Sequence, residues 1–119
     1  MSLKSPSGNG ATLWFFQRIS GLVLVLMLAK HFFVQHFSGT PTSGAIDFAT
    51  VTARFQDPLY AAFSLMFLVM AVAHGLNGVW MVTEDYLHKP WQRLTVWSLL
   101  MLAGLGMIAL AVVTTLSVA

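Results

Sequence analysis

The stretch PLYAAFSLMFLVMAVAHGLNGVWMVT, residues 58–83, decides the fold that we expect for this chain. A helix rises about 1.5 Å per residue, so an apolar run of this length can cross a hydrocarbon core of roughly 30 Å. Apolar residues occur all round the helix and form no single stripe, unlike those of a surface helix in a soluble protein. The stretch therefore predicts a transmembrane helix.

Two further apolar stretches, at about 14–37 and 94–118, are also long enough to span a membrane. Residues 38–57, which contain Gly, Ser and Pro, are expected to form a loop with a short interfacial helix around Phe48–Phe55. Residues 84–93 are expected to form a short polar turn. Strands are not expected, since a small lipid-embedded barrel needs eight alternating segments of about 10 residues.

We therefore predict an all-α membrane protein with three transmembrane helices, which form part of a heteromeric helical bundle. A polar segment, 1–13, precedes the three-helix membrane anchor, 14–119. The first span is interpreted as a retained helix and not as a cleaved signal peptide, because it is long and no small-x-small cleavage site follows it. The lipid bilayer is thus the first expected partner.

Composition excludes other classes of protein. Of 119 residues, 57% are hydrophobic and only 8% are charged, against about 25% charged in soluble domains. The net charge of +2 provides no basic surface for nucleic acid. The chain has no cysteine, so any iron–sulfur cluster in its complex must belong to a partner. The remaining strong transition-metal ligands are four histidines: His31, His36, His74 and His88.

Basic residues predict the orientation of the chain in the membrane, because cytoplasmic loops carry an excess of Lys and Arg. The side that holds the N-terminus carries Lys4, Arg18, Lys89 and Arg93. The opposite side carries Arg54 and, near the end of the first helix, Lys30. We therefore expect a cytoplasmic N-terminus and a periplasmic C-terminus in a bacterial inner membrane, or a matrix N-terminus in a mitochondrion.

His74 lies near the bilayer centre, about 16 Å below the end of its helix at Asp85. Ionisable groups at that depth are costly and usually functional. One interpretation is a neutral histidine bonded to a neighbouring carbonyl, and the other is an axial haem ligand. Small residues near His74, among them Gly75 and Gly78, leave a flat surface for a porphyrin, although glycines also permit close helix packing. The two uses of glycine are compatible.

Asp85 lies eleven residues after His74, on almost the same helix face, and Tyr86 lies beside it at the membrane boundary. A carboxylate and a phenol at this depth can hydrogen-bond the polar head of a quinone while its tail stays in lipid. Quinone reduction takes two electrons and two protons, so such a site needs access to water. The alternative is a plain helix end with a Tyr in the aromatic belt.

Arg18 is expected at the cytoplasmic end of the first helix, at a depth similar to that of Asp85. It either extends to the interface or pairs with an anion such as a haem propionate, and Ser20 could add a donor.

Three interpretations are open for His31: it faces the same haem, it ligates a second haem nearer the outside, or it is an interfacial polar residue. His36 is a weaker candidate for a ligand, and His88 is interpreted as a surface or proton-relay residue.

The segment HGLNGVWMVTEDYLHKP, residues 74–90, resembles the characteristic sequence of a small hydrophobic membrane anchor subunit, of cytochrome b type, in succinate dehydrogenase, respiratory complex II. The segment WFFQRIS, residues 14–20, is similar to the start of that family's first helix. Size and the three-helix layout match as well. The resemblance implies a membrane domain, formed with a second membrane anchor subunit, that holds a b-type haem and attaches a flavoprotein and an iron–sulfur protein.

The resemblance further implies that electrons pass from succinate through FAD and iron–sulfur clusters on partner subunits to ubiquinone or menaquinone. By position, His74 would be an axial ligand of haem b, Tyr86 would bond a quinone carbonyl with Asp85 in support, and Arg18 would lie near a propionate. The other axial histidine would come from the second anchor subunit. The chain itself would be a non-catalytic subunit of an oxidoreductase, and trimerisation of whole complexes is compatible with the sequence but not specified by it.

One departure from the family keeps a two-haem variant open, since Lys30, His31 and His36 are not part of the single-haem pattern. Two other functions are compatible with the sequence. The chain could be the anchor of a fumarate reductase, because the direction of catalysis depends on the quinone and the partner subunits. It could instead be a small non-redox helical scaffold or transport component, in which His74 and Asp85 would be packing or proton-relay groups.

Overall fold

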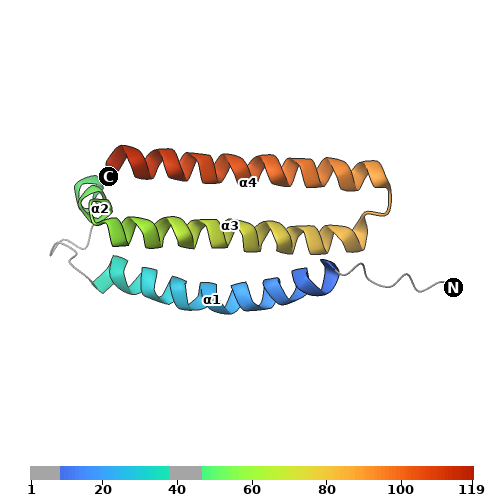
Figure 1. Cartoon of the computed structure of the whole chain (residues 1–119), viewed down its shortest axis with the longest axis horizontal. Coiled ribbons are helices and arrows are strands. Elements are labelled where there is room, and N and C mark those ends of the chain that lie inside the picture. The colour runs from blue at the N-terminus through green and yellow to red at the C-terminus, as the bar shows by residue number, and fades with distance from the viewer. Residues whose placement is uncertain (1–8, 38–46) are drawn as a thin grey trace.

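Four helices make up the part of the chain that the computed structural model describes, residues 9–37 and 47–119 (Figure 1). They are α1 (Asn9–Phe37), α2 (Phe48–Phe55), α3 (Pro58–Tyr86) and α4 (Pro90–Val118). Each of the three long helices has 29 residues, or about 44 Å at 1.5 Å per residue. All three are long and apolar enough to cross a membrane, which confirms the predicted all-helical fold with three spans.

The long helices extend beyond the apolar stretches that predicted them. α1 begins at Asn9, α3 continues to Tyr86, and α4 begins at Pro90, because helical hydrogen bonds continue into polar residues at the membrane boundary. Proline occupies the first turn of α3 and of α4, where its missing N–H costs no hydrogen bond.

The short helix expected around Phe48–Phe55 is confirmed as α2. Its N-cap, Asp47, accepts a hydrogen bond from the Thr50 backbone at 2.8 Å. Hydrogen bonds from Thr50 lower the pKa of Asp47 below its usual range and so keep the capping carboxylate ionised. Residues 1–8 of the predicted polar segment, with Lys4, and residues 38–46 of the predicted loop, 38–57, lie outside the described residues.

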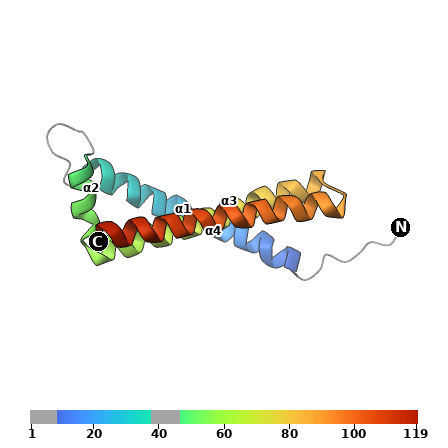
Figure 2. The ribbon, with the colours of Figure 1, turned by 90° about the horizontal axis from the view of Figure 1, so that it is seen from above.

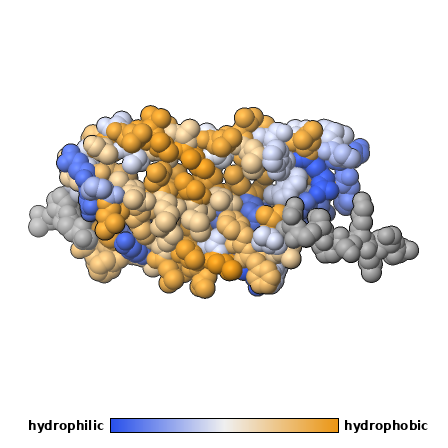
Figure 3. All heavy atoms as spheres, in the orientation of Figure 1, coloured by the Kyte–Doolittle hydropathy of each residue, from blue (hydrophilic) through white to orange (hydrophobic). Residues whose placement is uncertain are grey.

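The long helices form a single layer in which α3 lies between α1 and α4 (Figure 1). Seen from above, α4 follows α3 closely while α1 crosses both at an angle (Figure 2). Apolar side chains cover the middle of the layer and hydrophilic ones gather towards its ends (Figure 3). Among the described residues only four side chains are buried: Ser20, Met27, Ala61 and Val72. The layer therefore leaves both broad faces open to lipid or to other helices.

Small residues bring the helices together along the α3–α4 seam. Gly104 is buried, and a Cβ built on it would overlap Leu76 Cδ1 and lie 3.5 Å from Val72 Cγ1. In lipid, helices associate through close packing and hydrogen bonds rather than through the hydrophobic effect. Gly104 thus allows α4 to approach α3 more closely than any residue with a side chain would.

Candidate functional site

The candidate site lies where α1 crosses α3, at mid-height of the layer. His74 of α3 is about 24 Å from Pro58 and about 18 Å from Tyr86 along the helix axis. It therefore lies well inside the span, where an imidazole requires a polar partner.

Ser20 of α1 provides that partner. Its Oγ lies 2.8 Å from His74 Nδ1 and 3.3 Å from the Gln17 carbonyl oxygen, and Ser20 is 1% exposed. A hydroxyl has a single hydrogen. When that hydrogen is donated to the Gln17 carbonyl, His74 Nδ1–H must donate to Ser20 Oγ. Both bonds are then made at once, and Nε2 keeps the lone pair that binds a metal.

Gly21, next to Ser20, makes room for the imidazole. A Cβ built on Gly21 would lie 3.2 Å from His74 Cε1 and 4.0 Å from Nε2. The ring of His74 therefore lies against the α1 backbone, at a place where even a methyl group would be tight. Ser20 and Gly21 together hold the imidazole, the first by a hydrogen bond and the second by leaving space.

A second polar contact joins the two helices one turn from His74. Asn77 Nδ2 donates to Gln17 Oε1 at 2.8 Å and to the Leu13 carbonyl at 3.3 Å. Gly78 makes room for this contact, because a Cβ there would lie 2.8 Å from Gln17 Nε2. This pairing is not predicted from the sequence, although an amide at residue 17 and another at residue 77, each within an apolar helix, are signals for it.

An open cleft of about 370 Å³ lies beside the imidazole. Seven residues line it: Gln17, His74, Gly75, Gly78, Val79, Val82 and Thr83. A Cβ on Gly75 would meet nothing within 4 Å, so the cleft opens sideways and runs from His74 towards the Tyr86 end of α3. Its open side leaves room for a ligand that is covered on its other side by another chain.

The donor set fits haem better than a bare metal ion. Within residues 9–37 and 47–119 no three His, Cys, Asp or Glu side chains come together to hold a metal. A haem iron needs only axial ligands from protein, since the porphyrin supplies four nitrogens. One oriented imidazole, with an open cleft beside it that Gly75 and Gly78 help to line, meets that requirement from this chain.

Arg18 lies deeper than expected. The contacts of Ser20 with His74 and of Gln17 with Asn77 flank it, so Arg18 is level with residues 74–77 of α3 and not with Asp85. The prediction of equal depth is wrong because α1 already begins at Asn9, more than two turns before Arg18. The guanidinium is 4.3 Å from the centre of the Trp14 ring and the side chain is exposed.

The predicted quinone residues lie at the boundary end of α3. Tyr86 is its last residue and is 76% exposed, and Asp85 is exposed beside it. Thr83, one turn earlier, lines the cleft of His74. Asp85 and Tyr86 therefore lie on α3 just beyond the end of the cleft and do not contact His74.

The other histidines are not brought to His74. His31 lies about 16 Å further along α1 than Ser20, packs on Phe67 with ring centres 5.4 Å apart, and lines a different cavity. His36 lies against Phe32, with ring centres 4.3 Å apart. His88 is exposed in the turn between α3 and α4.

The fold and the site together define a class: a three-span helical membrane protein with an oriented imidazole at mid-depth beside an open cleft. A family model described as "Succinate dehydrogenase/Fumarate reductase transmembrane subunit" matches residues 2–118. The chain belongs to this family, which confirms the resemblance seen in its sequence.

Two curated relatives, both called succinate dehydrogenase hydrophobic membrane anchor subunit, are similar over 72 residues. One, from Archaeoglobus fulgidus, is 31% identical over 60% of this chain and 59% of its own length. The other, from Thermoplasma acidophilum, is 32% identical over 60% of this chain and 56% of its own length. The match thus spans a little over half the length of these relatives.

Proposed function

We propose that this chain anchors a succinate:quinone oxidoreductase in the membrane, supplies one axial ligand of haem b through His74, and forms part of a quinone site through Tyr86 and Asp85. The observation that carries the proposal is the bond between Ser20 and His74, because it holds the ring and, when Ser20 donates its hydrogen to Gln17, leaves Nε2 as the ligand atom. Family membership independently favours the same assembly.

Haem b, when bound, supplies a one-electron redox centre. Within this chain, His74 Nε2 would hold the iron, Ser20 would fix the tautomer and orientation of the ring, and Gly75 would leave the cleft open. A hydrogen bond to the second nitrogen of a metal-bound histidine makes the ligand more basic and fixes its orientation. The second anchor subunit would cover the open side of the cleft and provide the other axial ligand.

Arg18 is proposed to pair with a haem propionate. Its depth, level with residues 74–77, and its exposed guanidinium support that role, because a cation inside a span needs an anion or a path to water. Ser20 is proposed first as the partner of His74. A donor role of Ser20 towards a propionate is the weaker of its two proposed roles, because its one hydrogen already has an acceptor in Gln17.

Tyr86 and Asp85 are proposed to bind the head of ubiquinone or menaquinone. The Tyr86 hydroxyl would donate to a quinone carbonyl. Asp85 would orient that hydroxyl and would pass protons from water to the quinone head. Exposure of both side chains at the end of a span supports this role, since the tail of a quinone stays in lipid while its head must reach water-borne protons.

Partner subunits are proposed for the remaining chemistry. The flavoprotein would oxidise succinate with FAD, and the iron–sulfur protein would carry electrons to the membrane, because this sequence has no cysteine to ligate a cluster. The N-terminus is proposed to lie in the cytoplasm of a bacterial cell. His31, in a separate cavity, is the proposed ligand only if a second haem is present.

The family description favours one further function, since it names fumarate reductase beside succinate dehydrogenase. The anchor of a fumarate reductase would use the same residues with the electrons running the other way. Comparing the rates of succinate oxidation and fumarate reduction in the purified complex, with quinones of different potential, distinguishes the two.

The test of the haem assignment uses the assembled complex. Reduced-minus-oxidised spectra are recorded for the wild type, His74→Ala and, as a matched control, His88→Ala in the exposed turn. We expect the b-type band to be lost or strongly changed in His74→Ala and kept in His88→Ala. An unchanged band in His74→Ala removes the ligand role, and a colourless wild-type complex without quinone-linked activity favours the non-redox scaffold.

A further inference from the structure

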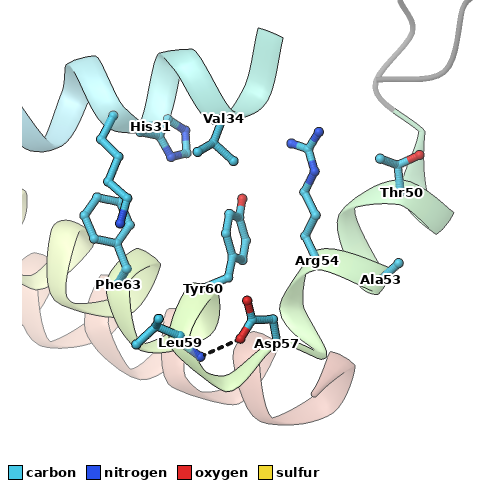
Figure 4. A pocket seen from close by; sticks show the side chains of 10 residues that line it. His31, Val34, Thr50, Ala53, Arg54, Asp57, Leu59, Tyr60 and Phe63 are labelled. Carbon is cyan, nitrogen blue, oxygen red and sulfur yellow. Dashed lines mark hydrogen bonds between the residues drawn. The ribbon is translucent and has the colours of Figure 1, made fainter. Parts of the chain in front are cut away.

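A second cavity, distinct from the cleft of His74, lies at the other end of the layer. It has a volume of about 630 Å³ and is formed by the last turns of α1, by α2 and by the start of α3 (Figure 4). In Figure 4 the side chains of His31, Tyr60 and Arg54 surround its interior, one from each of the three helices. None of these residues has a role in the haem cleft or at the Tyr86 end of α3.

Hydrogen bonds hold the walls of this cavity in place. Gln35 of α1 accepts a hydrogen bond from Arg54 Nη1 of α2 and donates one through Nε2 to the Tyr60 hydroxyl of α3 at 2.8 Å. One side chain thus connects all three helices. Within the described ranges the hydrogen of the Tyr60 hydroxyl has no acceptor, so it is available to a ligand as a donor.

The cavity contains more positive than negative charge. Lys30 Nζ lies 3.9 Å from the centre of the Phe63 ring, about 10 Å before the end of α1. Among the described residues Lys30 has no ion pair. The other cation of the lining is Arg54, and the one carboxylate, Asp57, already accepts the Leu59 backbone N–H at 2.9 Å as the cap of α3.

We propose that this cavity binds a phosphate group, with the phosphodiester of an anionic phospholipid as its source. The Lys30 ammonium and the Tyr60 hydroxyl are donors that match the acceptor oxygens of a phosphate, and the charge of Arg54 adds to the attraction for an anion. The cavity lies at the ends of two candidate spans, α1 and α3, where lipid headgroups are expected. Phe63 and the neighbouring apolar wall suit the glycerol and the first carbons of the acyl chains. With a cytoplasmic N-terminus this end of the layer faces the periplasmic side, so the lipid would come from the outer leaflet, and its phosphate would be attracted by the same short-range charge that basic pockets on the cytoplasmic side offer.

The test uses the assembled complex in detergent, washed until its lipid is removed. Three probes are added in turn: phosphatidylglycerol, diacylglycerol with the same acyl chains, and inorganic phosphate. Native mass spectrometry measures the bound probe and thermal unfolding measures stabilisation. The variants are Lys30→Gln, Lys30→Arg and Tyr60→Phe, and the control is Lys89→Gln, which removes the same charge from the exposed turn at the opposite end.

We expect the wild type and Lys89→Gln to bind phosphatidylglycerol but not diacylglycerol. Lys30→Gln should bind it about fivefold to tenfold more weakly, and Lys30→Arg should restore binding. Tyr60→Phe, which keeps the aromatic ring but removes the hydroxyl, should also bind phosphatidylglycerol more weakly. The proposal can therefore be tested even if Lys30→Gln fails to assemble into the complex. Saturable binding of inorganic phosphate that depends on Lys30 would assign the site to free phosphate. Equal binding of diacylglycerol, or wild-type binding by both Lys30→Gln and Tyr60→Phe, would overturn the proposal.

Discussion

The hydroxyl of Ser20 lies 2.8 Å from Nδ1 of His74, and this bond joins two helices at a distance of 54 residues along the chain. It is made at the crossing of α1 and α3, beside Gly21, where the backbones come close enough for a side chain as short as serine. The bond therefore fixes the register of the two helices, and it selects the Nδ1–H tautomer of the imidazole when Ser20 donates its hydrogen to the Gln17 carbonyl.

Ser20→Ala should raise the midpoint potential of the haem proposed at His74. The hydrogen bond from Nδ1–H makes the imidazole more basic and favours the oxidised iron, so its loss favours the reduced form. A hydrogen bond of about 1 kcal/mol corresponds to roughly 40 mV for one electron. We therefore expect the midpoint potential to rise by no more than this amount. Redox titration of the b-type band in the assembled complex measures it.

Ser117→Ala is the matched control, because Ser117 also donates to a carbonyl three residues earlier but is exposed at the end of α4. Its midpoint potential should equal that of the wild type. Equal potentials in Ser20→Ala and Ser117→Ala would show that Ser20 does not act on the iron ligand.

Gly21→Val should displace the imidazole. A Cβ at Gly21 would already lie 3.2 Å from His74 Cε1, and the two methyl groups of valine need still more of the space that the ring occupies. We expect loss of haem from the purified complex. Gly106→Val is the control, because a Cβ at Gly106 meets nothing within 4 Å. A full haem content in Gly21→Val would mean that the ring lies elsewhere in the assembled complex.

Asn77→Leu and Gln17→Leu should show coupled effects on stability, since Asn77 donates directly to Gln17. Interhelical hydrogen bonds in membranes contribute about 0.6 kcal/mol on average and about 1.7 kcal/mol at most. A double-mutant cycle, read from unfolding of the complex in detergent, should give a coupling energy in that range. Strictly additive effects would mean that the two amides do not form their bond in the assembled protein.

Tyr86→Phe should impair quinone reduction while succinate oxidation by a soluble dye persists. The substitution removes one hydroxyl from an exposed position at the end of α3, so packing should change little. A hydrogen bond of about 1 kcal/mol corresponds to a loss of roughly fivefold in the quinone kcat/KM. Steady-state kinetics with quinone and with dye on the same preparation separate the two steps, and wild-type quinone kinetics would contradict the assignment.

The sequence predicts the three membrane-spanning helices well, but it does not predict which residues of one helix contact those of another. The length of each apolar run is imposed by the thickness of the bilayer, so three helices can be read directly from it. The register of α1 against α3 depends instead on where Ser20, Gly21 and Gly78 allow close approach, which no single helix reveals. For that reason the pairing of Ser20 with His74 is not predicted, and the predicted depth of Arg18 is wrong by more than two helical turns relative to Asp85.

Gly104 offers the sharpest test of the α3–α4 seam. Gly104→Ala places a methyl group where it overlaps Leu76 Cδ1, so Leu76 must leave its position. Overpacking of this kind costs about 1–3 kcal/mol, and the complex should unfold at a lower temperature. Gly106→Ala, at a position with open space, should leave unfolding unchanged. Adding Leu76→Ala to Gly104→Ala should recover part of the loss, because it removes the opposing methyl group. If the double variant is no more stable than Gly104→Ala alone, the seam does not rest on the contact between these two residues.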